Sequence, residues 1–182
     1  TKDGKITGLH CHTTADHGAF DACADPTKFP AGFMNICTGS YDIPTAYLAV
    51  DGIYTNKAPG GVAYRCSFRV TEAAYFIERM IEVLAIKLGM DAAELRVKNF
   101  IKKEQFPYQS ALGWEYDSGD YQTGWEKALK AVGYEDLRKE QAERVEAFKR
   151  GETRKLLGIG LSHFTEIVGA GPVKNCDILG LG

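Results

Sequence analysis

The 182-residue sequence has no excess of basic charge, because 22 lysines and arginines face 24 aspartates and glutamates, for a net charge of −2. With so few unbalanced cations to neutralise phosphates, nucleic-acid binding is not expected. The sequence also lacks an apolar run near the roughly 20 residues that a membrane-spanning helix needs. Hydrophobic residues make up 45% and charged residues 25%, which is ordinary globular usage and excludes wholesale disorder.

Paired cysteine motifs are absent as well. The five cysteines are widely spaced, form no CxxC pair and are odd in number: Cys11, Cys23, Cys37, Cys66 and Cys176. A disulfide framework is therefore not expected, and the usage is typical of a reducing, cytoplasmic compartment. The chain opens on Thr1 without an initiator Met or a signal-peptide pattern, and it closes on the apolar run 178–182. From these ends we expect an excised piece of a longer protein.

The order of the secondary-structure signals predicts an α+β fold in which strands bracket a helical insert. We divide the chain into strands and a loop over 1–69, a helical region over 70–150 and a strand region over 151–182. Strands are expected over 4–13 and 46–54, a hairpin partner over 17–24, and an extended segment over 155–168. Apolar periodicity and caps predict helices from about Glu72 to Lys87 before Gly89, over 92–101 after Asp91, over 121–132 between Asp120 and Gly133, and over 135–150.

The strongest candidate for chemistry is a cysteine in a glycine-led loop. Gly60 and Gly61 allow close backbone approach, and Cys66 then lies between Arg65 and Arg69, just before the first expected helix. Nearby arginines and a helix N-terminus lower a thiol pKa, so Cys66 is expected to have thiolate character. A thiolate is a nucleophile or a ligand for Cu(I). The alternative interpretation, a small buried cysteine that fills a turn, remains open on this local chemistry.

Other polar clusters are weaker candidates. The set His10, Cys11, His12, His17 and Cys23 lacks the ligand spacing of known zinc sites. His163 has the chemistry of a base for a cysteine nucleophile, but nothing ties it to Cys66, and a half-buried strand histidine is the favoured interpretation. Four aromatic residues are expected to pack against the third helix or to form an interface, rather than to stack on nucleic-acid bases: Trp114, Tyr116, Tyr121 and Trp125.

The run Ala-Tyr-Arg-Cys-Ser-Phe-Arg at 63–69 resembles the active-site loop of the large (molybdenum) subunits of aerobic carbon monoxide dehydrogenases. These belong to the xanthine dehydrogenase or molybdenum hydroxylase superfamily, whose other members differ at the Cys-Ser-Phe positions. The segments 54–61, 104–108 and 116–121 are also similar to that superfamily, as are 164–166 and 169–172. The resemblance covers essentially the whole chain.

This resemblance implies a site in which molybdenum, on molybdopterin cytosine dinucleotide, is bridged by sulfide to copper and oxidises carbon monoxide with water. Cys66 matches the copper ligand, and Phe68 matches the aromatic residue that closes the pocket over the copper. Arg65 and Ser67 are expected to line the cofactor, with Arg69 a weaker candidate. The family's glutamate base lies beyond residue 182 and is not Glu166, so residues 1–182 alone are expected to be inactive.

The same resemblance implies partners. Electrons would pass to iron–sulfur clusters on a small subunit, then to FAD on a medium subunit and on to a quinone. The expected assembly is a dimer of heterotrimers in the cytoplasm, peripheral at the inner face of the membrane. Two alternatives stay open: a copper-free molybdenum hydroxylase acting on an aldehyde or N-heterocycle, and a non-catalytic scaffold for subunit contacts.

Overall fold

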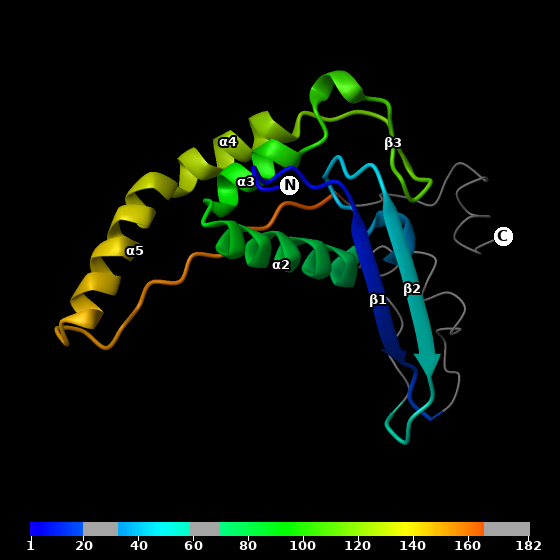
Figure 1. The fold of residues 1–182 in the computed structure, drawn as a ribbon, viewed down its shortest axis with the longest axis horizontal. Helices are drawn as coiled ribbons and strands as arrows, with labels where there is room; N and C mark the ends of the chain where they lie inside the picture. The colour runs from blue at the N-terminus through cyan, green and yellow to red at the C-terminus, as the bar shows by residue number, and fades with distance from the viewer. Residues whose placement is uncertain (20–32, 59–69, 166–182) are drawn as a thin grey trace.

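The computed structural model describes residues 1–19, 33–58 and 70–165, and its mixture of strands and helices confirms the predicted α+β class (Figure 1). The strands are β1 (Leu9–Asp16), β2 (Ala46–Ile53), β3 (Tyr108–Gln109) and β4 (Glu115–Tyr116). The helices are α2 (Val70–Leu88), α3 (Ala92–Asn99), α4 (Tyr121–Val132) and α5 (Tyr134–Lys149), with a 3-10 turn, η1, at Lys103–Gln105.

Strand β1 pairs with β2 in parallel, with Leu9 opposite Ala46 and Asp16 opposite Ile53. The predicted hairpin at 15–18 is therefore wrong: the His17 N–H donates to the Ile53 carbonyl at 2.9 Å, and the chain continues beside β2 rather than turning back. The expected partner strand lies outside the described residues from position 20 onward. Parallel pairing with β2 instead provides the backbone hydrogen-bond partners of β1.

Local end signals account for the helix boundaries. The Asp91 carboxylate accepts the N–H groups of Ala93 and Glu94 at 2.8 and 3.3 Å and starts α3. Asp120 caps α4 in the same way. Gly133, with φ of +67°, ends α4 and begins α5, because a left-handed residue changes the direction of the chain. The predicted boundaries are confirmed to within about two residues.

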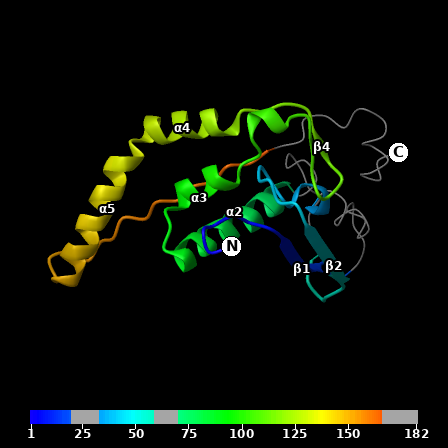
Figure 2. The same ribbon diagram turned by 45° about the horizontal axis from the view of Figure 1, so that its top comes forward.

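Helix α5 is charged along most of its length, and Figures 1 and 2 show it leading away from the sheet as the continuation of α4. The chain after it, drawn in orange in Figure 1, runs back toward α2. A strand is expected here, yet residues 151–165 form none. Side chains of the helices bind this backbone in place of a sheet: Arg96 Nη2 donates to the Leu161 carbonyl at 2.9 Å, and the His163 N–H donates to Glu78 at 2.9 Å. Residues 166–182 lie outside the described part.

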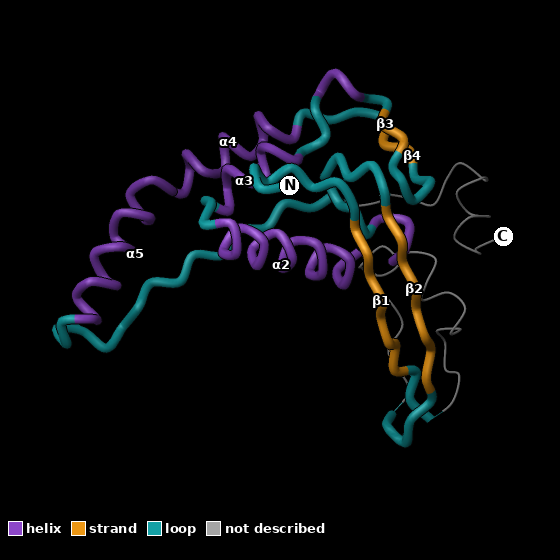
Figure 3. The backbone as a smooth tube through the Cα atoms, in the orientation of Figure 1, coloured by secondary structure: helices purple, strands orange, loops and turns teal. Residues whose placement is uncertain are grey.

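Within the part of the chain that the structure describes, the core consists of three apolar clusters. The first lies among α2, α3 and α4 and contains Ile77, Ile81, Leu95, Phe100 and Trp125. The second lies where β1 and β2 meet the start of α2, an arrangement that can be followed in Figure 3. The third contains Trp114 and Tyr116. Tyr121 packs against the first and third clusters, so the expected packing of the four aromatic residues around α4 is confirmed.

Two isoleucines on α2 provide a matched test of this core. Ile81 is 1% exposed and Ile86 is 75% exposed on the same helix. Ile81→Ala is expected to lower the free energy of unfolding by about 2–5 kcal/mol, because it removes buried methyl groups and leaves a cavity. Ile86→Ala is expected to change it by less than about 0.5 kcal/mol. Urea unfolding of both variants measures this, and equal losses would contradict the assigned core face.

Candidate functional site

The four predicted site residues Arg65, Cys66, Ser67 and Phe68 lie in the segment 59–69, outside the described residues. The structure does describe the chain that enters this loop and the helix that leaves it. The site is therefore defined by how these two anchors are held and by the side chains that gather beside them.

The entry to the loop is held by Asp16 at the end of β1. Its carboxylate accepts from the Thr55 hydroxyl at 2.7 Å and from the Gly18 N–H at 2.9 Å, and it pairs with Lys57 Nζ at 2.9 Å. The hydrogen bond from Thr55, followed by that from Lys57, lowers the pKa of Asp16 to about 2. The carboxylate is thus ionised at neutral pH and ties β1 to the segment that leads into the loop.

The exit of the loop is held by apolar packing. Helix α2 begins at Val70, four positions after Cys66, and Val70 and Ala73 are 5% and 1% exposed. They pack with Leu48 of β2 and with Ile36 in the second cluster. The predicted helix start directly after the cysteine loop is confirmed. The partial positive charge of a helix N-terminus favours an anion such as a thiolate beside it.

A narrow cleft of about 10 Å³, room for about one water molecule, lies along this first part of α2. Three separate segments meet there: residues 36–39, the start of α2, and residues 163–165. Gly39 has φ of +56°, and a Cβ at this position would lie 3.1 Å from Ile77 Cγ2, so glycine allows the turn to approach the helix closely. The lining residues are Ile36, Gly39, Val70, Ala73, Ala74, Ile77, His163, Phe164 and Thr165.

A chain of polar side chains runs from this cleft into the protein. His163 Nδ1 lies 2.9 Å from Ser40 Oγ, which lies 2.7 Å from Thr165 Oγ1. Phe100 packs against the imidazole, with ring centroids 4.8 Å apart. Burial, followed by the charge of Arg96, lowers the pKa of His163, so the ring is neutral at pH 7. The expectation of a half-buried histidine is confirmed, whereas the strand expected around it is not formed.

A buried ion pair underlies this arrangement. Arg96 is fully buried and Glu78 is 5% exposed, with Arg96 Nε 2.9 Å from Glu78 Oε2. Arg96 also pairs with Glu82 at 3.0 Å, and Tyr41 donates its hydroxyl proton to the second Glu78 oxygen. Burial, together with the neighbouring carboxylate of Glu78, raises the pKa of Tyr41, so its hydroxyl stays protonated.

Neither Glu78 nor Arg96 is among the predicted site residues, although the sequence contained a signal for the buried position of Glu78. Glu78 precedes Ile81 by three positions and Ala85 by seven, so it shares their buried helix face. A carboxylate on an apolar helix face requires a buried cation or a proton. The sequence does not indicate which of its 22 basic residues supplies the cation.

The weaker candidates have ordinary contacts in the described residues. His12 Nε2 lies 2.6 Å from Asp51 Oδ2, and the His10 ring contacts Tyr47 edge-on. Cys11 is buried on the opposite face of β1. No group of three or more His, Cys, Asp or Glu side chains is arranged for a metal ion within 1–19, 33–58 and 70–165. Across the same ranges, no helix is both long and apolar enough to cross a membrane.

The sequence matches one protein-family model and several known proteins. Residues 1–100 match the family model described as molybdopterin cofactor-binding domain. The carbon monoxide dehydrogenase large chains of Afipia carboxidovorans and Hydrogenophaga pseudoflava are 72% and 67% identical over 181 and 182 residues, covering 100% of this chain and 22% of each relative. A crystal structure of the Cu,Mo-CO dehydrogenase in its carbon monoxide reduced state matches with a TM-score of 0.91 at 72% identity, over 100% of this chain and 23% of that one. The chain spans about a fifth of the length of these relatives.

The buried ion pair generates a stability prediction. Glu78→Gln leaves the Arg96 charge without its main partner and is expected to cost about 3–5 kcal/mol in the free energy of unfolding. The control is Glu146→Gln, which removes a pair that Glu146 makes with Lys149 on the surface of α5. That change is expected to leave the free energy of unfolding almost unchanged, because solvent screens an exposed pair. Denaturant unfolding compares the two, and equal losses would contradict the central role of Glu78.

His163 generates a pH prediction. Because its folded pKa is lowered, protonation opposes folding, and the penalty is absent above the unfolded pKa of about 6.5. Stability is therefore expected to fall as the pH falls from about 6.5 through the folded pKa. His163→Asn is expected to lose this part of the pH dependence. Unfolding free energies at pH 7.5 and 5.5 measure it, and an unchanged difference between the two pH values in the variant would exclude His163 as the titrating group.

Proposed function

The chain belongs to the family of molybdopterin cofactor-binding domains, and on that basis we propose that it is part of the large subunit of an aerobic carbon monoxide dehydrogenase. The carrying observation is the 72% identity, over the whole chain, to a curated large chain of that enzyme. The residues 63–69, with their central cysteine, resemble the active-site loop of the same proteins. The proposed reaction oxidises carbon monoxide with water to carbon dioxide.

Cys66 is the proposed copper ligand. Cu(I) prefers a soft thiolate, and both the flanking arginines and the helix that begins at Val70 favour that ionised form. The two cysteines within the described residues do not suit this role: Cys11 and Cys37 are buried together in the second cluster, and burial raises the pKa of the Cys37 thiol. A protonated, buried thiol is a poor ligand.

The described anchors fit a loop that presents one thiolate to a bound group. The Asp16 clamp holds the entry, and the packed start of α2 holds the exit. Gly39, which has no side chain, and the methyl groups of Ala73 and Ala74 line the cleft beside that exit, where bulky side chains would close it. These features support two anchors that are already fixed on either side of the loop, which lowers the entropy that cofactor binding would cost.

In this proposal the bound molybdenum–copper group supplies the two-electron chemistry, CO + H₂O → CO₂ + 2H⁺ + 2e⁻. The residues of the chain hold and shape it: Cys66 carries the copper, Phe68 narrows the pocket to a very small substrate, and Arg65 and Ser67 contact the molybdopterin cytosine dinucleotide. The general base is outside residues 1–182. We therefore expect these residues alone to show no oxidation of carbon monoxide.

The proposed partners are a small subunit with iron–sulfur clusters and a medium subunit with FAD, arranged as a dimer of heterotrimers. A quinone would take the electrons, which would bring the cytoplasmic enzyme to the inner face of the membrane. These statements rest on the similarity to carbon monoxide dehydrogenase large chains, of which this chain spans about a fifth.

The copper assignment is tested with Cys66→Ser in the full-length enzyme. A serine hydroxyl is a hard, protonated group at neutral pH and a poor Cu(I) ligand, so copper is expected to be lost while molybdenum is retained. Cys37→Ala, which removes a buried thiol elsewhere, is the control and is expected to retain both metals. Metal analysis of the two variants measures this. Equal copper and molybdenum in Cys66→Ser would overturn the assignment of Cys66 as the copper ligand, and molybdenum without copper in the unaltered enzyme would favour the copper-free hydroxylase.

Phe68 is tested with Phe68→Ala in the same enzyme. If the ring is a pocket wall, turnover of carbon monoxide is expected to fall while copper stays bound and the melting temperature changes little. If it is a core element, the loss of stability is expected to be about 3–5 kcal/mol. Melting temperature, copper content and turnover are measured on one preparation. A large loss of stability with unchanged turnover per metal-loaded enzyme would remove Phe68 from the site.

A further inference from the structure

Residues 54–58, which we call the lead-in, connect the end of β2 to the cysteine loop, and they stay bonded to the chain that follows β1 (Figure 3). The Thr55 N–H donates to the Gly18 carbonyl at 2.8 Å. The Ala19 N–H donates to the Lys57 carbonyl at 3.0 Å. The point at which the cysteine loop begins therefore depends on how firmly the lead-in is held beside the end of β1.

Apolar burial contributes little to holding the lead-in within the described part of the chain. All of its residues are exposed except Thr55, which is half-buried. None of them belongs to the three apolar clusters of the described residues. Because the lead-in buries so little apolar surface, polar contacts are what hold it in place.

Asp16 provides the charged contacts of the lead-in. Its Oδ1 accepts from the Thr55 hydroxyl at 2.7 Å and from the Gly18 N–H at 2.9 Å. Its Oδ2 pairs with Lys57 Nζ at 2.9 Å. Hydrogen bonds in which one partner is ionised are shorter and stronger than neutral ones. One carboxylate thus binds both the turn after β1 and two positions of the lead-in.

The Thr55 side chain passes this contact on to the backbone of the lead-in. Its hydroxyl donates to Asp16, and the same oxygen accepts the Lys57 N–H at 3.4 Å. A hydroxyl has one proton and two lone pairs, so the two bonds form together and the carboxylate fixes the direction of the hydroxyl. Asp16 and Thr55 therefore act in series, and loss of either side chain removes the same support of Lys57.

We propose that Asp16 is a positioning residue for the copper ligand: through Thr55 and Lys57 it sets where the loop that carries Cys66 begins. This inference rests on the function proposed above for Cys66. The exit of the loop is already fixed by packing at the start of α2, so the entry is the end at which a polar contact decides the course of the chain. Release of the entry lengthens the connection between the two anchors, and a longer connection lowers the effective concentration of the thiol at any one point.

Cysteine alkylation in the full-length enzyme tests this role. The enzyme is freed of copper with a Cu(I) chelator and treated with iodoacetamide, and mass spectrometry follows the labelling of each cysteine with time. Asp16→Ala is expected to raise the alkylation rate of Cys66 by about two- to fivefold, the range that corresponds to loss of one exposed ion pair. Thr55→Val is expected to give a rise of similar size. Asp51→Ala is the matched control and is expected to leave the rate unchanged, because Asp51 pairs with His12 across the same two strands at 2.6 Å.

Two further readings separate positioning from a general loosening of the fold. Cys37 is buried in the second cluster, so its alkylation rate is expected to stay the same in Asp16→Ala. The double variant Asp16→Ala/Thr55→Val is expected to label Cys66 no faster than Asp16→Ala alone, because the two side chains act in series. The proposal would be overturned by a Cys66 rate in Asp16→Ala equal to that in the Asp51→Ala control, by an equal rise at Cys37, or by additive effects in the double variant.

The outcome for Asp16 can be told apart from the outcome for the proposed reaction. The copper content of the unaltered enzyme tests whether copper is present, whereas alkylation is measured on the copper-free protein. An unaltered enzyme without copper would contradict the proposed function, and the alkylation rates would still decide whether Asp16 positions Cys66.

Discussion

The buried pair between Glu78 and Arg96 is the interaction on which the described structure depends. Arg96 reaches α2 through Glu78 and Glu82, and it binds the return segment through the Leu161 carbonyl. Glu78 in turn accepts the His163 N–H. Two charged side chains therefore connect α2, α3 and residues 161–163. Because a buried charge without a partner is costly, these elements are expected to keep their arrangement together.

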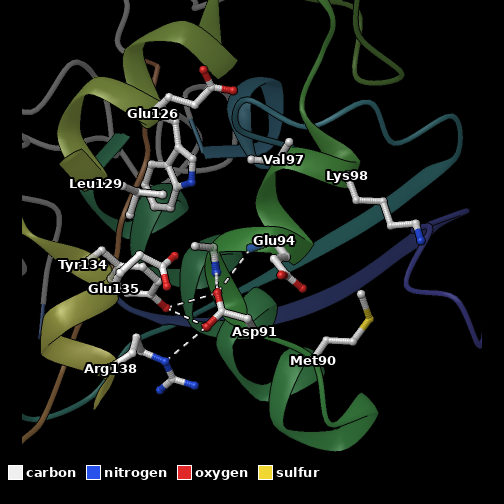
Figure 4. A pocket seen from close by; sticks show the side chains of 12 residues that line it. Met90, Asp91, Glu94, Val97, Lys98, Glu126, Leu129, Tyr134, Glu135 and Arg138 are labelled. Carbon is white, nitrogen blue, oxygen red and sulfur yellow. Dashed lines mark hydrogen bonds and ion pairs between the residues drawn. The ribbon is translucent and has the colours of Figure 1, made fainter. Parts of the chain in front are cut away.

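This ion pair also positions part of the site, because it holds residues 161–163 beside α2. His163 and Thr165 reach the cleft beside α2 only because the return segment is held on that helix. The exit of the cysteine loop is fixed by a different force, the packing of Val70 and Ala73 against the sheet. Polar bonds and apolar packing thus meet at one end of α2. The opposite end of α2 leads into Met90 and Asp91, which line a groove among α3, α4 and α5 (Figure 4).

The helix boundaries could be predicted from the sequence, because they depend on residues close to each other in the chain. Asp91 and Asp120 start helices, and Gly89 and Gly133 end them, because each acts on backbone groups within a few positions of itself. The loop motif around Cys66 is equally local, and it predicted the family that the comparisons later identified. Its three-dimensional geometry remains a prediction, since the loop lies outside the described residues.

Strand pairing and the conformation of residues 155–165 required contacts between residues far apart in the chain. Strand β1 pairs with β2 rather than turning back on itself, because the tertiary fold brings residues 46–53 beside it in parallel. Residues 155–165 have a strand-like pattern but form no strand, since Arg96 and Glu78 already bind their backbone. The sequence by itself thus determined the helices and their ends, and the cysteine-loop motif indicated the family. Only the tertiary structure decided strand pairing and the partner of Glu78, because these depend on long-range hydrogen bonds and charges that no short window of sequence contains.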